Sequence, residues 1–227
     1  VTGGTQGIGF GIARAFANAG AKVHITGTRD TAADYDNDLS DFTYHQVQLS
    51  RPEAREALTA ALPELDVLVN NAGMARPDEY TLAGYAEVME VNLSAAVDLC
   101  FRYHGALKAR RGAIVNVASG AGHISLRDMP AYTASKSGMF GFTRAVADKW
   151  ARDGIRVNQV APGFIDTRII DHVRGDSQRH GNAIRSIPMR RYGTPDEVAS
   201  AVLFLASEDA AYIAGHSLVI DGGLLLP

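Results

Sequence analysis

Tyr132 and Lys136, in the stretch PAYTASKSG at residues 130–138, are two side chains that can transfer a proton. On a helix, residues four apart lie on one face, so both side chains can point into the same cleft. A free phenol has a pKa of about 10, and a nearby ammonium lowers that pKa because it stabilises the phenolate. The spacing therefore predicts a phenol tuned for proton transfer, with donors of Lys136 left to hold hydroxyl groups of a ligand. Taken alone, the same spacing is more often the mark of two neighbours on a helix surface.

A serine thirteen residues before the tyrosine adds a third polar group. Ser119 follows the apolar run 113–117, which reads as a strand. Ligands of open α/β sheets bind at the carboxyl ends of the strands, so we expect Ser119 to lie where a reacting carbonyl would bind. Its hydroxyl can share the carbonyl oxygen with Tyr132 and stabilise the charge that develops there. The three residues together predict a proton donor, a polarising hydroxyl and a cation that tunes the donor.

The glycine-rich stretch TGGTQGIG, residues 2–9, has the composition of a loop that binds phosphate groups. Glycine adopts positive φ in the turn and lets phosphates approach the backbone N–H groups at the start of a helix. The alternative is an ordinary turn between a strand and a helix. The strand end before it and the amphipathic helix after it favour a dinucleotide. The residues expected to contact the dinucleotide are Gly3, Thr5, Gln6, Gly7, Ile8 and Gly9.

The end of the second strand bears on the choice between the two nicotinamide cofactors. An acidic side chain there bonds the ribose 2′-hydroxyl and repels a 2′-phosphate. The stretch ITGTRD has Gly27 at this place, followed by Thr28 and Arg29, and a guanidinium can pair with a phosphate. Asp30 and the uncharged Gln6 oppose this interpretation, and Arg29 can instead be a solvated surface charge. The stretch favours NADP(H) over NAD(H).

A further ligand-facing segment is predicted where VLVNNAGMA, residues 67–75, ends a buried strand. Amide side chains there can hold neighbouring strand ends and line the adenine and ribose side of a cofactor, and a glycine permits close approach. We expect Asn71, Ala72 and Gly73 to contact the cofactor. The alternative is a plain turn that ends the strand.

Short apolar runs that alternate with helical patterns, as in βαβ units, position these segments. The expected strands are residues 22–26, 42–47, 66–70, 113–117, 156–160 and 217–220. Apolar periodicity predicts helices over 8–19 and 131–152, and Thr194 with Pro195 predicts the start of another. The pattern predicts an α/β fold, a doubly wound parallel sheet that forms a single domain over residues 1–227. Because VTGGTQGIG reads as the end of a strand, we expect the first strand to be largely missing from the chain.

Two segments depart from this alternation. Residues 30–41 carry five aspartates with little apolar periodicity, so we expect a short or irregular crossover. Residues 164–192 carry six arginines and three aspartates, with Gly175 and Gly181 as candidate hinges. Loops of this length in a compact domain are more often functional than idle, so we expect a substrate lid at about 164–192.

Composition argues against several classes of protein. A formal net charge of −3 gives no basic footprint for nucleic acid or an anionic membrane surface. Cys100 is the only cysteine, which excludes an intrachain disulfide, and since the histidines show no ligand spacing we expect no metal. No run approaches the roughly eighteen apolar residues of a membrane helix, and we expect no charged and apolar leader before Val1. We expect a cytoplasmic protein without nucleic-acid or membrane partners.

These motifs, in this order and spacing, resemble those of the short-chain dehydrogenase/reductase family over essentially the whole chain. The motifs that carry the resemblance are Thr2-Gly3 with Gly7-Ile8-Gly9, the run Asn70 to Gly73, Asn92 in VNLS, Ser119, Tyr132 with Lys136, and Pro162-Gly163 followed by Thr167. The resemblance implies a Rossmann fold and a catalytic group of Asn92, Ser119, Tyr132 and Lys136, in which Asn92 holds a water that links Lys136 to solvent. It implies that Tyr132 and Lys136 also contact the cofactor. It further implies contacts to the nicotinamide from Pro162, Gly163, Ile165 and Thr167.

The activity implied by the resemblance is NAD(P)-dependent hydride transfer between a nicotinamide and a carbonyl or secondary alcohol, with Tyr132 giving or taking the proton. The pattern is most like that of members acting on 3-oxoacyl thioesters or on sugars and other polyols, and another small ketone is an open alternative. The family implies a homo-oligomer, a tetramer or a dimer. In many members the last strand, here within residues 214–223, packs in a tetramer. The competing hypothesis is a catalytically silent dinucleotide-binding sensor or scaffold.

Two departures from the family pattern concern the cofactor end of the chain. Gln48 stands where the family often has an aspartate that contacts adenine, and Gln6 stands where many NADP(H)-preferring members have a basic residue. Within the expected lid, the basic side chains make an anionic substrate conceivable, and the alternative is a solvated lid whose charges touch nothing. These side chains are Arg168, Arg174, Arg179, Arg185, His172 and His180.

Overall fold

The computed structural model describes residues 1–170 and 175–226 and contains two groups of parallel strands. In the first group β1 (His24–Gly27) pairs with β2 (Thr43–Gln46). The second group has the order β3-β4-β5-β6, and its members are β3 (Val67–Asn70), β4 (Ala113–Val117), β5 (Arg156–Pro162) and β6 (Ser217–Ile220). All six strands lie at the places expected from the apolar runs, and their ends differ from the expected ones by two residues at most.

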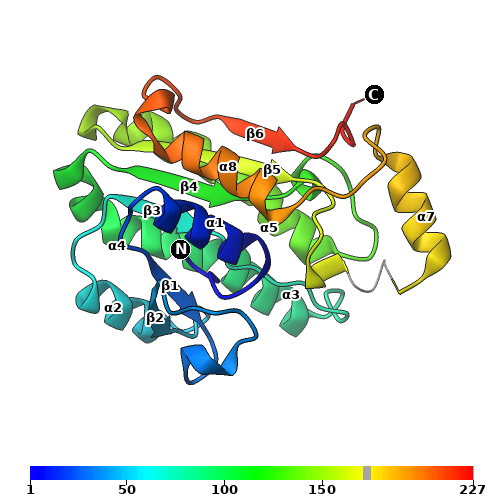
Figure 1. Cartoon of the computed structure of the whole chain (residues 1–227), viewed down its shortest axis with the longest axis horizontal. Helices are drawn as coiled ribbons and strands as arrows, with labels where there is room; N and C mark the ends of the chain where they lie inside the picture. Colours follow the sequence, from blue (N-terminus) through cyan, green and yellow to red (C-terminus); the bar gives the residue numbers. More distant parts are fainter. Residues whose placement is uncertain (171–174, 227) are drawn as a thin grey trace.

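The first two residues of the chain lie between the two groups of strands. The Thr26 N–H donates to the Val1 carbonyl at 3.1 Å, and the Thr2 N–H donates to the Val69 carbonyl at 3.0 Å. Figure 1 shows the N-terminus at this position, between β1 and β3. The strand pairs and this connection give the order of a doubly wound parallel sheet, so the predicted fold class is confirmed.

Helices cover both faces of the strands (Figure 1). One face packs against α1 (Gly7–Asn18) and α8 (Pro195–Ala206), and the other against α4 (Ala95–Arg110) and α5 (Pro130–Trp150). Successive strand residues point to opposite faces of the sheet. Leu68 and Ile114 pack on the side of α4 and α5. Val69 and Val115 pack on the side of α1 and α8. This alternation is why the strands are apolar at nearly every position.

Helix ends follow local sequence signals. The Thr194 hydroxyl accepts from the Glu197 N–H at 3.2 Å and the Glu197 carboxylate accepts from the Thr194 N–H at 2.8 Å, which is a capping box with Pro195 at the first helical position. The predicted start of α8 is therefore confirmed. Helix α5 ends at Trp150, and a 3₁₀ turn leads to Gly154, whose φ of +79° reverses the chain into β5.

The remaining elements are short or connect the main ones. They are α2 (Pro52–Ala61), α3 (Leu82–Met89), α7 (Ser177–Ser186), a π-helix (Glu90–Ser94) between α3 and α4, and 3₁₀ turns at Ala32–Asp34, Gly120–Gly122, Ala151–Asp153, Arg168–Ile170 and Glu208–Ala210. Among the described residues, none of the helices has the length and apolar character needed to cross a membrane.

The two segments that depart from the alternation of strands and helices differ in their structure. Residues 30–41 contain one 3₁₀ turn as their only helix, as predicted. Residues 164–192 contain α7, which the sequence did not suggest, and the Asp176 carboxylate caps it by accepting from the Gln178 and Arg179 N–H groups. Figure 1 shows α7 beyond the carboxyl ends of β4 and β5, on the side where ligands of such sheets bind.

Candidate functional site

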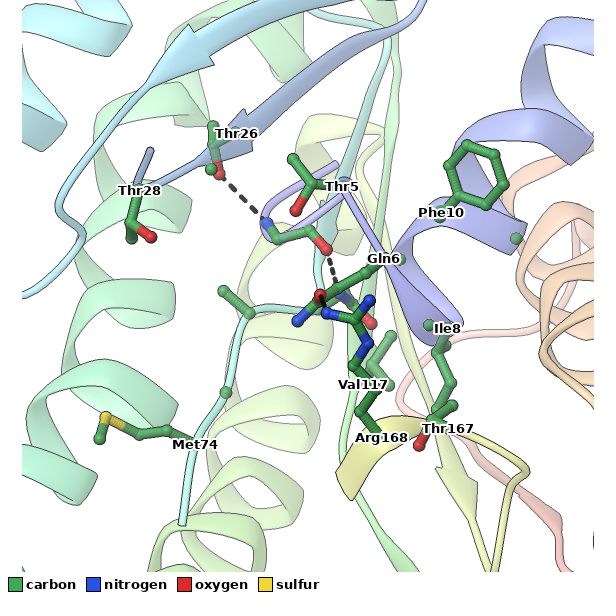
Figure 2. Close-up of a pocket in the computed structure, with 18 of the residues that line it drawn as sticks. Thr5, Gln6, Ile8, Phe10, Thr26, Thr28, Met74, Val117, Thr167 and Arg168 are labelled. Carbon is green, nitrogen blue, oxygen red and sulfur yellow. Dashed lines mark hydrogen bonds between the residues drawn. The ribbon is translucent and has the colours of Figure 1, made fainter. Parts of the chain in front are cut away.

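A cleft of about 850 Å³ opens at the carboxyl ends of β1, β3 and β4. It is lined by the glycine loop and by the segments that follow these strands (Figure 2). Of the sequence-predicted residues, the lining includes Gly3, Thr5, Gln6, Gly7, Ile8, Gly9, Arg29, Asn71, Ala72, Gly73, Tyr132, Lys136 and Thr167. Segments far apart in the sequence thus converge on one cavity, as the sheet topology requires.

The glycine loop leaves no room for a side chain at Gly9. A Cβ atom on Gly9 would collide with the Gly3 carbonyl oxygen and with the side-chain amide of Asn71. That amide donates to the Thr2 carbonyl at 2.9 Å and to the Gly3 carbonyl at 3.2 Å, while the Gly3 N–H donates to the Thr26 hydroxyl at 3.1 Å. Asn71 therefore fastens the loop to the end of β3, a role that the sequence motif did not specify.

The first turn of α1 offers unpaired donors to the cleft. Gln6 is the N-cap residue, but its side chain makes no capping hydrogen bond, and no acidic residue occupies the first turn. The N–H groups and the positive end of the helix dipole are therefore available to an anion. Gly7 has a φ of +55° and lies against Thr167, whose Cγ2 would be 3.3 Å from an added Cβ. These features fit the pyrophosphate of a dinucleotide.

The turn after β1 is held by two tyrosines. The Tyr35 hydroxyl accepts from the N–H groups of Thr28 and Arg29 at 2.9 and 3.0 Å, and the Tyr44 hydroxyl donates to the Arg29 carbonyl. The Arg29 guanidinium lies 4.8 Å from the centre of the Tyr35 ring and donates to the Asp34 carbonyl. Arg29 is thus exposed at the cleft but stacked on Tyr35, rather than a free surface charge.

The irregular segment 30–41 reaches across the mouth of the cleft. The Asn37 amide donates to the Thr5 carbonyl at 2.9 Å, and Asp36 forms an ion pair with Arg168. The Arg168 guanidinium also donates to the Gln6 side chain at 3.3 Å, and Figure 2 shows it directed at the glycine loop. Arg168 was predicted as a candidate contact for an anionic substrate, yet it lines the cleft beside the glycine loop. Sequence alone does not place it there because its position depends on how two distant loops fold.

Lys136 is a buried cation at the centre of the site. Its Nζ donates to the Val117 carbonyl at 2.9 Å and lies 5.6 Å from the centre of the Tyr132 ring. A Cβ on Gly73 would lie 3.5 Å from this Nζ and 3.4 Å from the Asn92 side-chain oxygen, so the missing side chain leaves space beside both groups. Burial lowers the pKa of Lys136 to about 8.

Tyr132 does not have the lowered pKa that the spacing predicted. Burial raises the pKa of the Tyr132 phenol, the hydrogen bond with Ser119 lowers it, and the charge of Glu79 raises it further. Lys136 bonds to the Val117 carbonyl instead of to the phenol, and its own pKa is lowered. The expectation that Lys136 lowers the pKa of the phenol is therefore wrong for this arrangement. Ser119 lies close enough to Tyr132 to affect the pKa of the phenol, and its hydroxyl accepts from the Ala121 N–H at 3.1 Å.

Asn92 is buried in the π-helix between α3 and α4. Its amide accepts from the Met74 N–H at 2.8 Å and donates to the Met74 carbonyl at 2.8 Å and to the Ser135 hydroxyl at 3.2 Å. The side chain thus fixes the turn after Gly73 beside Lys136. The water-holding role implied for Asn92 stays a prediction.

The four residues predicted to contact the nicotinamide lie in two different environments. Thr167 lines the cleft, whereas Pro162, Gly163 and Ile165 do not and instead shape the turn that follows β5. The Gly163 N–H donates to the Ile220 carbonyl at 2.9 Å, and Ile165 is buried and bridges to Gly193.

Apart from Arg168, the basic side chains of the expected lid make local contacts where the structure describes them. Arg179 pairs with Asp176 at 3.5 Å, and the His180 ring lies 3.0 Å from the Tyr192 hydroxyl. Arg185 donates to the Asn182 side chain. The other two candidates, His172 and Arg174, lie outside the described residues.

Several residues that line the cleft were not among the predicted cofactor contacts. They are Thr26, Thr28, Asn37, Gln48, Met74, Val117 and Arg168. Thr28 directly follows β1 and Val117 ends β4, and that position is a signal that could have found these two. Gln48 donates to the Ser50 hydroxyl at 3.2 Å, at the place where an adenine contact was expected.

Comparisons with known proteins give a consistent result. Residues 3–225 match the family described as Enoyl-(Acyl carrier protein) reductase. The chain is 38% identical to the 3-oxoacyl-(acyl-carrier-protein) reductase FabG of Chlamydia muridarum, covering 99% of this chain and 95% of that protein. It is 36% identical to the 2-dehydro-3-deoxy-D-gluconate 5-dehydrogenase of Bacillus subtilis, covering 99% and 93%.

A solved structure shares the fold closely. It is that of a candidate 2-deoxy-D-gluconate 3-dehydrogenase from Agrobacterium tumefaciens with bound NADP, which aligns with a TM-score of 0.90 at 35% identity. The alignment covers 100% of this chain and 95% of that chain. The similarity therefore extends over the whole arrangement of strands and helices that builds the cleft.

Proposed function

The chain belongs to the short-chain dehydrogenase/reductase family of NAD(P)-dependent oxidoreductases acting on CH–OH and C=O groups, and from this premise we propose how its own residues carry the reaction. We propose that the nicotinamide cofactor lies in the cleft and that Ser119, Tyr132 and Lys136 serve the proton transfer. The observation that carries the proposal is that Tyr132 and Lys136 line the cleft at the carboxyl end of β4, with Ser119 close to Tyr132, beside a glycine loop that has no room for a Cβ at Gly9.

The bound nicotinamide supplies the hydride or accepts it. Tyr132 gives a proton to the carbonyl oxygen in reduction, or takes it from the alcohol in oxidation. Ser119, which lies near Tyr132, holds the same substrate oxygen and orients it. Lys136 is buried with its Nζ 5.6 Å from the centre of the Tyr132 ring, and the donors that it does not use on the Val117 carbonyl are available to ribose hydroxyls.

We propose NADP(H) as the preferred cofactor. Gly27 takes the place of the carboxylate that would repel a 2′-phosphate. Arg29 is exposed at the adenosine end of the cleft, and its stacking on Tyr35 limits the entropy lost when the guanidinium binds a phosphate. The related Agrobacterium protein binds NADP, which supports the same choice.

For the substrate we propose a small ketone or secondary alcohol of the 3-oxoacyl thioester, sugar acid or polyol type. The named activities of the two curated relatives support this range. We also propose that residues 164–192 act as the substrate lid of a single domain, because α7 stands beyond the carboxyl ends of the strands (Figure 1). The sensor or scaffold alternative has no observation in its favour, since the serine, tyrosine and lysine converge.

A two-step experiment tests the proposal. Thermal unfolding is followed during titration with NADPH and with NADH, and the better ligand is then used with a panel of carbonyl and alcohol substrates. We expect a larger increase in Tm with NADPH, because a ligand that binds the folded state stabilises it by mass action. A larger shift with NADH would overturn the cofactor assignment. No shift with either cofactor, together with no turnover in the panel, would overturn the proposed function.

We propose in addition that the protein is a homo-oligomer, a tetramer or a dimer. Phe101 on α4 is 57% exposed, although it packs edge-on against Phe142 and Trp150 of α5. A large aromatic side chain at the surface beside two others is typical of a contact between subunits.

A further inference from the structure

Glu79 is a buried acid that contacts the backbone of the proposed proton donor. Its side chain lies in the segment between β3 and α3 and is part of a residue only 2% exposed. One carboxylate oxygen accepts from the Tyr132 N–H at 2.9 Å, and the other accepts from the Arg76 N–H at 3.2 Å. Buried carboxylates are costly unless they are paired or hydrogen-bonded, so this placement needs a physical reason.

The start of α5 provides that reason. Its N-cap residue is Met129, whose side chain makes no capping bond, and Pro130 at the first helical position has no N–H. Tyr132 is the third helical residue, and its N–H is one that an N-cap side chain ordinarily satisfies. Glu79 makes this bond from a distant part of the chain, and its negative charge is favourable at the positive end of the helix dipole.

The segment that carries Glu79 is itself firmly held. The neighbouring Tyr80 hydroxyl donates to the Arg127 carbonyl at 2.7 Å, so two consecutive residues tie this segment to the chain that leads into α5. Thr81 caps α3 by accepting from the Gly84 N–H at 3.0 Å. A Cβ on Gly84 would collide with the Asp78 carbonyl, so glycine allows α3 to pack closely against the segment. The carboxylate therefore has a fixed position from which to hold α5.

We propose that Glu79 is a positioning residue for Tyr132, which caps α5 from outside the helix and sets both the place and the charge environment of the phenol. This inference rests on the proposed function, because Glu79 acts through the proton donor. It assigns a role to a residue that no motif of the chain indicated.

The charged and polar groups that face Tyr132 come from three elements. They are Lys136 on α5, Ser119 after β4 and Glu79 before α3. Because the Glu79 charge raises the pKa of Tyr132, its removal lowers that pKa. A Glu79→Gln variant keeps an oxygen that accepts the Tyr132 N–H and loses the charge, whereas Glu79→Ala loses both. The two variants therefore separate charge from position.

The experiment measures the pH dependence of kcat for alcohol oxidation, and the Kd for NADPH by fluorescence titration, in the wild type and three variants. Oxidation requires the phenolate, so the rate rises with pH as Tyr132 loses its proton. For Glu79→Gln we expect the rising limb to move to lower pH with a plateau close to that of the wild type. For Glu79→Ala we expect the plateau to fall about tenfold to a hundredfold, because the phenol is misplaced. In both variants the Kd for NADPH stays within about threefold, since Glu79 is not part of the cleft lining.

The matched control is Glu87→Gln, which removes a carboxylate that pairs with Arg76 on the exposed side of α3. We expect its pH profile to overlay that of the wild type. A Glu79→Gln profile that also overlays the wild type would overturn the proposal, and this variant decides the question even if Glu79→Ala fails to fold. If Tyr132→Phe turns out fully active, the proposed function itself fails. If Tyr132→Phe is inactive and both Glu79 variants behave as the wild type, only the role of Glu79 fails.

Discussion

At the scale of single residues, the site is a set of polar groups that burial makes responsive to charge. Lys136 loses part of its preference for the charged state, and the Tyr132 phenol holds its proton more tightly than a free phenol does. The protonation states of the two groups therefore depend on neighbouring charges and on whether a ligand fills the cleft. The site is therefore built at a cost in folding stability.

That cost can be measured at Lys136. A lowering of its pKa from 10.5 to about 8 corresponds to about 3 kcal/mol for keeping the buried ammonium charged. A Lys136→Met variant removes this cost but also the hydrogen bond to the Val117 carbonyl, so we expect it to be more stable than the wild type at pH 7 by roughly 1–3 kcal/mol. Urea unfolding without cofactor measures the difference.

The pH dependence of this difference has a definite sign. Below about pH 8 the lysine is charged in both the folded and the unfolded state, so the full cost is present. As the pH rises from about 8 to 10.5, the folded protein releases the proton before the unfolded protein does. The free energy of unfolding of the wild type therefore rises relative to that of the variant. If the difference in unfolding free energy between wild type and variant stays constant over this window, or if the variant is less stable at pH 7, burial of the charged Lys136 does not destabilise the folded protein.

At the scale of elements, the glycine loop and α1 form a cradle that tolerates no side chain at Gly9. A Gly9→Ala substitution forces the loop away from Asn71, so we expect the Kd for NADPH to rise by about tenfold or more and the stability to fall by about 1–3 kcal/mol. Gly105→Ala in α4 is the matched control, because nothing lies within 4 Å of its added Cβ. It should stabilise the protein by up to about 1 kcal/mol, as alanine favours a helix. Unchanged binding in Gly9→Ala would contradict the cradle.

Two substitutions in the loops around the cleft should have opposite effects on the Kd for NADPH. Arg168 is shared between Asp36 and the Gln6 side chain at the glycine loop, where the phosphates are expected. Arg168→Ala should raise the Kd for NADPH, and Asp36→Ala should lower it by releasing the guanidinium, each by about twofold to tenfold because both side chains are more than half exposed. Isothermal titration at two salt concentrations checks this. Effects of the same sign in both variants would mean that the ion pair does not compete with the cofactor.

The elements also show which features can be predicted from sequence. Strands such as β4 were located because both faces are apolar, and the start of α8 was located because Thr194, Pro195 and Glu197 act locally. The contact of Arg168 with Gln6 and the capping of α5 by Glu79 have no local signal, because they join residues 162 and 53 positions apart. Residue types and spacing identified the candidate chemistry, but the direction of the Tyr132 pKa shift depends on burial and on partners that only the folded chain provides.

At the scale of the whole molecule, the sheet order brings distant segments to one edge and leaves an exposed aromatic side chain on α4. Phe101 is the exposed member of the group that it forms with Phe142 and Trp150. If this surface joins subunits, Phe101→Glu should reduce the mass measured by light scattering to that of a smaller assembly, because a buried unpaired charge is unfavourable. Leu82→Glu, at a site 90% exposed on α3, is the control that should keep the wild-type mass. A wild type that is monomeric would contradict the proposal.

The central claim, that Tyr132 moves the proton in a nicotinamide-dependent reaction, is tested most directly by one variant. Tyr132→Phe removes the hydroxyl and keeps the ring, so it is compared with the wild type in carbonyl-dependent NADPH oxidation, with Tyr212→Phe on the surface as control. We predict that kcat/KM falls by about 10²–10⁴-fold while the Kd for NADPH stays within about threefold, because general acid catalysis is lost and the cradle is intact. Carbonyl-dependent oxidation at the wild-type rate in Tyr132→Phe would contradict the account.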